Sequence, residues 1–255
     1  MTLPLMGFLA LGSSNLASGQ PPARFLDWPV LEDILRTGEV VAIKDMGVGA
    51  NKPLKVTLRK QGRTADAVWK PIKRGPREEA WESYQAEVAA YELDKMLGLR
   101  MVPPTVEREI HGLKGSLQLW LAGSRSFQDA RAEAPGGVAW DRTMSRMKTF
   151  DNLISNSARS DKDFMVDSEW NVLLIDHSQA FLSTNELNAR PDQIPTIFDK
   201  ALMERLRSLQ SDILQMRFGR LLLDPQVRAI LGRRDALLTW MEKLIAEKGE
   251  SAVLF

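Results

Sequence analysis

The stretch FDNLISNSARSDKDFMVDSEWNVLLIDHSQAF, residues 150–181, places a charged loop between apolar segments. The loop itself, NSARSDKDF at 156–164, holds two basic residues and two aspartates around Ala158. The segments FMVD and NVLLID that follow predict a pair of strands, the second of which ends in Asp176. Binding and catalytic groups are often carried by loops beside a rigid strand. The stretch therefore predicts a functional loop held in place by a small sheet.

Helical patterns surround this stretch. A polar, glycine-bearing segment at 123–141 is interpreted as a link, and a helix is predicted to follow it at 143–154. Amphipathic periods predict further helices at 199–218 and 225–248. The second half of the chain is therefore expected to be mostly helical.

The last of these helices has clear sequence signals at its ends. Asp224 is interpreted as its N-cap, and Gly249 lies just past its end. Arg233 and Arg234, next to Asp235, are interpreted as an ion-pair group on its surface.

The first half of the chain has a different period. Helices are predicted at 28–38 and 78–97. Short segments rich in valine and isoleucine, separated by turns that contain glycine, predict antiparallel strands at 39–47, 53–62, 64–72, 105–110 and 115–121. A strand-rich half followed by a helix-rich half indicates an α+β protein of two lobes with a cleft between them.

The expected organisation has three parts. Residues 1–24 form a signal-like or flexible N-terminal segment, residues 25–121 an N-lobe, and residues 122–255 a C-lobe. The apolar run at 3–11, followed by small and polar residues, resembles a signal-peptide core with a cleavage region near 17–19, although no basic residue precedes it. This pattern favours export to the periplasm, and the alternative is a frayed or docked segment of a cytoplasmic protein. No apolar segment is long enough to predict a transmembrane helix.

Composition excludes several classes of function. The chain of 255 residues has 34 basic and 33 acidic residues, so it offers no net positive charge for nucleic acid. Cysteine is absent, which excludes disulfides, thiolate catalysis and cysteine-bound zinc. His111 and His177 are the two histidines and lie far apart in the sequence. Any metal is therefore expected to be bound by oxygen.

Four features occur in an order that suits phosphoryl transfer. They are the glycine-bearing turn GVGANK at 47–52, Lys70 in a strand, Glu87 in the next helix, and the 156–164 loop followed by a strand that ends in Asp176. Transfer from ATP requires backbone amides over the phosphates, a lysine that binds them, and acids that hold Mg²⁺. Each feature alone also fits a hairpin turn, a solvated charge or a turn cap. Their order favours an ATP site.

At this point the sequence resembles a known family, the bacterial branch of the atypical kinases. The resemblance rests on AVWKPI, YQAEVAAYELDKMLGLRMVPPTVER, GSLQLWL, the 150–181 stretch, and RRDALL with EKGESAVLF near the end, and it runs from about residue 31 to residue 255. That branch is related to the phosphatidylinositol 3- and 4-kinases, the HipA-type kinases and the secretory-pathway casein kinases.

The resemblance implies a bilobal, protein-kinase-like fold that binds ATP with Mg²⁺ or Mn²⁺ between its lobes. It implies that Lys70 contacts the ATP phosphates and that Glu87 pairs with Lys70. The remaining residues implied to bind the nucleotide are Gly47 and Gly49 of the glycine-bearing turn and Gln118, Leu119, Trp120 and Leu121 of the hinge beside the adenine.

The resemblance also assigns roles in the loop. Family members usually read LIxNxDRxxxN, followed by a strand that ends in IDHxxxF. The matching residues here are Asn156, Arg159, Asp176, His177 and Phe181. Asp163 stands where an asparagine or an acid binds metal, so Asp163 and Asp176 are the implied metal ligands. Ala158 occupies the position of the catalytic aspartate.

A methyl group at position 158 cannot accept a proton, and loss of a general base costs a factor of about 10² to 10⁴ in rate. Three interpretations follow. The chain is a pseudokinase that binds nucleotide without transferring phosphate. Alternatively, it is an active enzyme that phosphorylates a protein or lipid hydroxyl with Asp161 as the substitute acid and Arg159 beside it. The third is an engineered substitution or a structural role without ATP.

Overall fold

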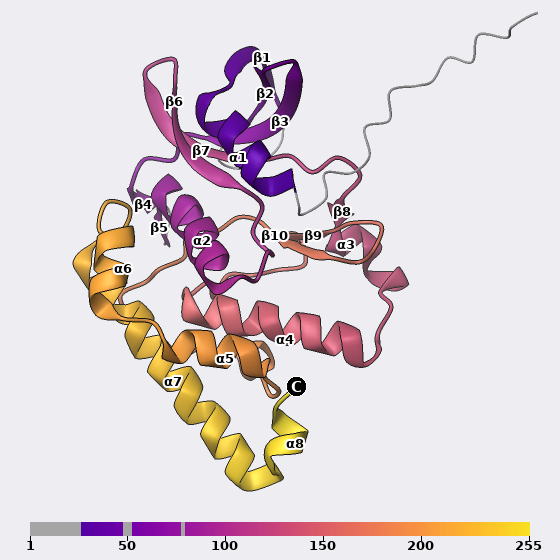
Figure 1. Cartoon of the computed structure of the whole chain (residues 1–255), viewed down its shortest axis with the longest axis vertical. Coiled ribbons are helices and arrows are strands. Elements are labelled where there is room, and N and C mark those ends of the chain that lie inside the picture. Colours follow the sequence, from indigo (N-terminus) through magenta and orange to yellow (C-terminus); the bar gives the residue numbers. More distant parts are fainter. Residues whose placement is uncertain (1–26, 48–52, 78–79) are drawn as a thin grey trace, which may run out of the picture.

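The computed structural model describes residues 27–47, 53–77 and 80–255. The signal-like segment 1–24 and Gly49 lie outside the described residues. In the described part, strands dominate the first half of the chain and helices the second (Figure 1). The N-lobe comprises the elements from α1 to β7, and the C-lobe those from β8 to α8. The predicted α+β class is confirmed.

The N-lobe is built on a five-stranded antiparallel sheet of order β1-β2-β3-β7-β6. Its strands are β1 (Glu39–Asp45), β2 (Leu54–Lys60), β3 (Arg63–Lys70), β6 (Thr105–Ile110) and β7 (Leu113–Leu119). Helix α1 (Trp28–Thr37) packs on the face that carries Trp69 and Leu117. Because side chains alternate along a strand, Lys70 and Gln118 stand on the opposite face.

The strand register arranges that opposite face in rows. Gln118 is paired with Val68 on one side and with Thr105 on the other. Ser116, two residues before Gln118, is paired with Lys70. Paired residues project to the same side of a sheet, so one row carries Thr105, Gln118 and Val68, and the neighbouring row carries Lys70.

Helix α2 (Tyr84–Leu97) lies against this second face, where the Tyr84 hydroxyl donates to Glu107 Oε2 at 2.8 Å. The prediction of a helix from residue 78 was wrong. Two short paired strands, β4 (Gly75–Arg77) and β5 (Ala80–Glu82), come first. The helix begins after Ser83, whose side chain accepts a hydrogen bond from Gln85 N as an N-cap.

Ionic contacts hold α2 to both lobes. Glu92 of α2 accepts hydrogen bonds from Arg36 of α1 at 3.3 Å and from Arg217 of α6 at 3.1 Å. The neighbouring Glu32 of α1 accepts from the Tyr91 hydroxyl at 2.6 Å. Both glutamate side chains are only 15% exposed, so these contacts are less screened by water than ordinary surface pairs.

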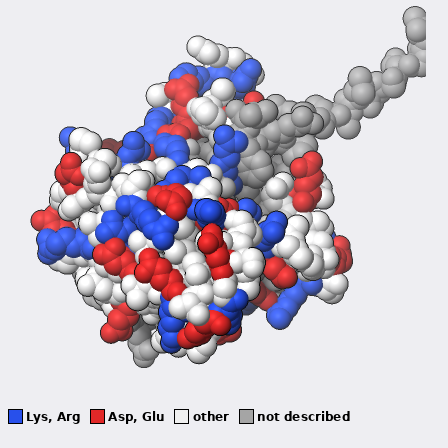
Figure 2. Space-filling view, turned by 60° about the horizontal axis from the view of Figure 1, so that its bottom comes forward, with Lys and Arg blue, Asp and Glu red and all other residues white. Residues whose placement is uncertain are grey.

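The C-lobe joins a small three-stranded sheet, of order β10-β9-β8, to the helices that surround it. Its elements are β8 (Arg125–Ser126), α3 (Phe127–Ala130), η2 (Arg131–Glu133), α4 (Gly137–Leu153), β9 (Phe164–Val166), β10 (Val172–Leu174), η3 (Pro191–Gln193), α5 (Lys200–Arg207), α6 (Ser211–Phe218), α7 (Asp224–Lys248) and α8 (Glu250–Val253). None of the helices within the described ranges is long and apolar enough to cross a bilayer. Figure 2 shows basic and acidic side chains intermingled over the face that it views.

Three predictions about the C-lobe were wrong. The supposed link at 123–141 contains β8, which pairs with β9, and the beginning of α4. The helix predicted at 199–218 is interrupted, because the backbone is extended at Gln210 next to the buried Leu209. Helix α7 begins at Asp224 itself, since the Asp224 carboxylate accepts from the Gln215 side chain instead of capping the helix.

Arg233 also differs from its prediction, because it is fully buried, whereas Arg234 does pair with Asp235. The Arg233 guanidinium donates to three backbone carbonyls, those of Leu153 at 2.8 Å, Leu182 at 2.8 Å and Thr184 at 2.5 Å. Burial lowers its pKa to about 10, so it remains charged near neutral pH. Helix α7 is thereby attached to the end of α4 and to the segment that follows Phe181.

Asp94 near the end of α2 makes the fold sensitive to pH. It is buried, and its Oδ2 has no hydrogen-bond partner among the described residues. Burial raises the pKa of Asp94 to about 7, against the hydrogen bonds from the backbone at residues 100–102 that lower it. The folded chain therefore keeps a proton between about pH 4 and pH 7 that the unfolded chain has released.

Because the folded state holds the extra proton, the free energy of unfolding should fall as pH rises from 4 to 7, by up to about 4 kcal/mol from Asp94. Asp94→Asn keeps an acceptor for Met101 N but cannot titrate, so it should flatten the profile in this window. Urea unfolding at several pH values checks this. An unchanged slope in the variant would show that Asp94 is ionised throughout.

Candidate functional site

Lys70 at the end of β3 forms the centre of a charged cluster between the lobes. Its Nζ lies 2.7 Å from Glu87 Oε1 of α2 and 3.2 Å from Asp176 Oδ1. The side chains of Lys70 and Glu87 are only 15% and 2% exposed. The sequence-predicted lysine and glutamate are thus brought together, with the acid that ends the NVLLID strand beside them.

Electrostatics keep both members of this pair charged. Burial lowers the pKa of Lys70, but Glu87 and Asp176 outweigh burial and raise that pKa above its ordinary value. Burial likewise raises the pKa of Glu87, and Lys70 outweighs it and holds that pKa well below the usual range. Gly115 allows β7 to approach closely, because a Cβ there would lie 2.7 Å from the Lys70 carbonyl oxygen.

An apolar pocket of about 190 Å³ opens beside Lys70. It is lined by both lobes, and it includes all four residues predicted as the hinge: Met46, Pro53, Val68, Lys70, Pro103, Gln118, Leu119, Trp120, Leu121, Ser124, Met165, Leu173 and Ile175. Gly47 is not among its lining residues. It has a positive φ of 63°, and its N–H donates to Asp45 Oδ1 at 2.8 Å.

Arg159 anchors the charged loop from within. Its Nε and Nη2 donate to the two carboxylate oxygens of Asp151 at 2.9 and 2.8 Å, and its Nη1 donates to the carbonyl of Ile175 at 2.6 Å. Asn156 donates to the same carboxylate at 3.1 Å. Arg159 is only 5% exposed. In this arrangement it positions the loop against the end of β10.

Sequence reasoning missed Asp151. It is buried at the end of α4 within the apolar segment FDNLI. A buried carboxylate needs a charged or hydrogen-bonding partner, so an acid inside an apolar run was a signal that pointed to the nearby Arg159.

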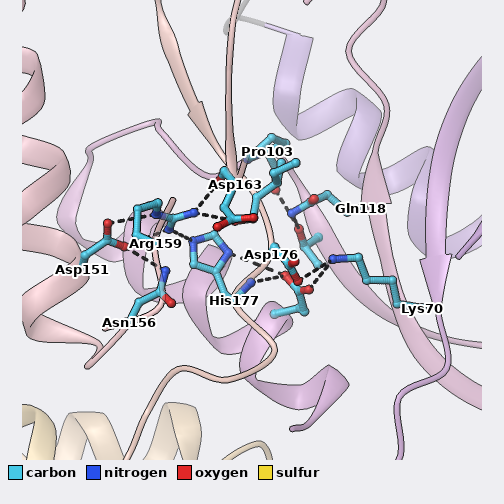
Figure 3. Close-up of polar contacts among 12 residues, drawn as sticks. Lys70, Pro103, Gln118, Asp151, Asn156, Arg159, Asp163, Asp176 and His177 are labelled. Carbon is cyan, nitrogen blue, oxygen red and sulfur yellow. Dashed lines mark hydrogen bonds and ion pairs between the residues drawn. The ribbon is translucent and has the colours of Figure 1, made fainter. Parts of the chain in front are cut away.

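His177 connects the two ion pairs (Figure 3). Its Nε2 lies 3.0 Å from Arg159 Nη2, and since a guanidinium can only donate, Nε2 is the acceptor and Nδ1 carries the proton. That Nδ1 faces Glu87 Oε2 at 3.6 Å, and the His177 backbone N–H donates to the same oxygen at 3.0 Å. Burial lowers the pKa of His177, with Arg159 acting in the same direction. The imidazole is therefore neutral at pH 7.

Asp163 and Asp176, the predicted metal ligands, follow and precede turns of the same small sheet. The Asp163 carbonyl accepts from Ile175 N at 3.1 Å, which places the two acids side by side in the chain fold. Asp163 Oδ2 accepts from Ser160 N at 2.8 Å and from Ser160 Oγ at 2.6 Å. Asp176 has a φ of 60°, a left-handed conformation that non-glycine residues rarely adopt.

These acids fit a divalent cation of one type. No group of three or more metal-binding side chains occurs among the described residues. Mg²⁺ is commonly held by one or two carboxylates while water and phosphate complete its coordination. Asp163 and Asp176 therefore suit a metal that arrives with a polyphosphate, and they do not suit a cation held by protein alone.

Ala158 and Asp161 lie on the outer part of the loop. Ala158 is exposed. Asp161 Oδ2 pairs with Arg131 Nη1 at 2.9 Å, with side chains 38% and 73% exposed respectively. Exposed pairs of this kind contribute about 0 to 1 kcal/mol. The Asp161 carboxylate is thus held toward η2 by a contact that is easily broken.

Comparison with solved structures identifies the fold. The chain superposes on a hydra Fam20 structure containing a sugar with a TM-score of 0.69 and 15% identity, over 91% of this chain and 93% of that chain. It superposes on the Golgi casein kinase with a TM-score of 0.63 and 14% identity, over 88% and 78%. The Golgi casein kinase with Mn/ADP bound gives 0.64 and 15%, over 89% and 78%.

No family model matches the sequence, and no curated protein is significantly similar to it. The chain therefore has the fold of the Fam20 and Golgi casein kinases, and at these identities the likeness concerns the fold alone. The predicted bilobal kinase-like fold is confirmed, as is the structural part of the resemblance to secretory-pathway casein kinases.

Proposed function

We propose that this chain binds ATP together with Mg²⁺ or Mn²⁺ in the pocket between its lobes and transfers phosphate slowly or not at all. The observation that carries the proposal is Lys70, held by Glu87 at the edge of an apolar pocket of about 190 Å³. An apolar pocket suits a nucleobase, and a fixed ammonium beside it suits the phosphates. The neighbour with Mn/ADP bound supports this assignment.

The charges around the pocket make the metal necessary. Lys70 contributes one positive charge, whereas Glu87, Asp163 and Asp176 contribute three negative charges. A polyphosphate alone would meet two unbalanced negative charges. Asp163 and Asp176 would hold the divalent cation, which supplies the positive charge that offsets them.

The residues present account for binding better than for transfer. Lys70 orients the phosphates, and Arg159 with His177 fixes the loop that faces them. Position 158, where the resemblance places the catalytic base, offers only a methyl group. Without a group that accepts the proton of the attacking hydroxyl, positioning and electrostatics remain as the sources of rate enhancement.

A second candidate is an active phosphotransferase that acts on a protein or lipid hydroxyl, with Asp161 as the base. The observation in its favour is the weak, exposed contact between Asp161 and Arg131. Release of that contact would free a carboxylate three positions beyond Ala158.

Ligand-induced stabilisation tests the binding proposal. Saturating ATP with Mn²⁺, at about 100 times its Kd, should stabilise the chain by about 2.7 kcal/mol and raise Tm by roughly 5 to 10 °C. Lys70→Met should remove most of that rise, relative to its own baseline. EDTA should remove it from the parent protein, because the uncompensated carboxylates then repel the phosphates.

Lys243→Met is the matched control, since Lys243 is 61% exposed on α7. It should keep the full rise in Tm. Differential scanning fluorimetry measures all of these shifts. A parent protein whose Tm does not respond to ATP and Mn²⁺ would refute the proposed function.

A further inference from the structure

The pocket wall away from Lys70 presents few polar side-chain groups. Among the lining residues, most are aliphatic, proline or methionine, and Trp120 is partly exposed to solvent. The remaining polar side chains are the amide of Gln118 and the hydroxyl of Ser124. In an apolar pocket, a few such groups decide the orientation and specificity of the ligand.

A chain of hydrogen bonds fixes the orientation of the Gln118 amide (Figure 3). The hydroxyl of Thr105, which is fully buried, donates to the Pro103 carbonyl at 2.8 Å. A carbonyl can only accept, so the single hydroxyl proton is used there. Thr105 Oγ1 must then accept from Gln118, whose Nε2 lies 3.0 Å away. Gln118 consequently keeps its Oε1 for the pocket.

Ser124 is arranged in the same sense. Its hydroxyl donates to the Leu121 carbonyl at 2.8 Å, so its oxygen offers only lone pairs to a ligand. Both polar side chains of this wall therefore act as hydrogen-bond acceptors. A ligand edge that meets them is stabilised if it carries N–H groups, and a ligand carbonyl placed there would face oxygen lone pairs.

We infer that Gln118 selects a nucleobase with an exocyclic amine, so that the site prefers adenine to the corresponding 6-oxo purine. This inference rests on the proposed nucleotide site and adds its base specificity. Lys70 marks the phosphate end of the pocket, and Gln118 stands in the neighbouring row of the sheet, where the base would lie. A buried carbonyl without a donor weakens binding by about 10- to 100-fold.

Titration of the full chain with ATP and with inosine triphosphate, both with Mn²⁺, tests the inference. The two nucleotides differ at the purine 6-position, where ATP carries an amine and inosine triphosphate an oxo group with a proton on N1. The parent protein should bind ATP at least about tenfold more tightly. Purine riboside triphosphate, which lacks any group at this position, should also bind more weakly than ATP.

Two variants locate the origin of the preference. Gln118→Leu removes the acceptor, and Thr105→Val keeps Gln118 but removes the group that orients it. Each should reduce the ATP preference to within about threefold. Thr57→Val is the matched control, because the Thr57 hydroxyl bonds Asp66 on β3 at 2.7 Å and neither residue lines the pocket. It should keep the parent preference.

The outcomes separate the two proposals. Equal affinity of the parent for ATP and inosine triphosphate would overturn the inference while leaving nucleotide binding intact. A preference that survives in Thr105→Val would show that the hydrogen-bond chain does not set it. Absence of binding by all three nucleotides would refute the proposed function and the inference together.

Discussion

Replacing Ala158 with aspartate is expected to raise the rate of phosphate transfer from ATP by about 10²- to 10⁴-fold. The loop is already fixed by Arg159 and Asp151, so a new carboxylate at position 158 would stand on an ordered backbone. Ala158 is exposed, so the larger side chain meets no close packing. The measurement is ATP turnover with Mn²⁺, with the production of ADP followed over time.

Ala158→Asn is the control for this prediction, because asparagine has the shape of aspartate but does not accept a proton as a base. It should leave turnover near that of the parent. Equal rates in the aspartate and asparagine variants would contradict a missing general base. In parallel, a large loss of turnover in Asp161→Asn would support the second candidate, in which Asp161 already serves as the base.

Arg159→Met is expected to destabilise the chain by about 3 to 5 kcal/mol. The substitution removes the partner of the buried Asp151 and leaves its carboxylate uncompensated. It also removes the donor to the Ile175 carbonyl next to Asp176. Urea unfolding of parent and variant gives the change in the free energy of unfolding.

Two further variants test the physical reason. Asp151→Asn added to Arg159→Met should recover part of the loss, because the uncompensated charge is gone. Arg131→Met breaks the exposed pair with Asp161 and should cost less than about 1 kcal/mol. Similar losses in Arg159→Met and Arg131→Met would show that burial of the Asp151 pair contributes little.

Much of the N-lobe could be predicted because its signals are local. Alternating apolar residues and glycine-containing turns specify strands, and the register then follows from short hairpins. The start of α2 was missed because the helical pattern continues upstream of Ser83, and the pairing of β4 with β5 depends on contacts across a turn. The break before Ser211 was missed for a similar reason, since burial of Leu209 depends on tertiary packing.

The candidate site was predictable as an order of residue types, and its geometry was not. Lys70, Glu87 and Asp176 are far apart in the sequence, and only the fold shows that they meet. The buried Arg233 looked like a surface residue because Arg234 and Asp235 follow it directly. A helix presents successive residues in directions about 100° apart, so neighbours in sequence can have opposite environments.

The attachment of Arg233 has a consequence for dissecting this protein. A fragment that ends before α7 would retain every residue proposed to bind nucleotide, yet it would lose the guanidinium that bonds the carbonyls of Leu153, Leu182 and Thr184. Those carbonyls flank the loop and the strand end where Asp163 and Asp176 lie. The smallest autonomous ligand-binding unit therefore extends through α7, and truncation libraries should place their C-terminal boundaries beyond residue 248.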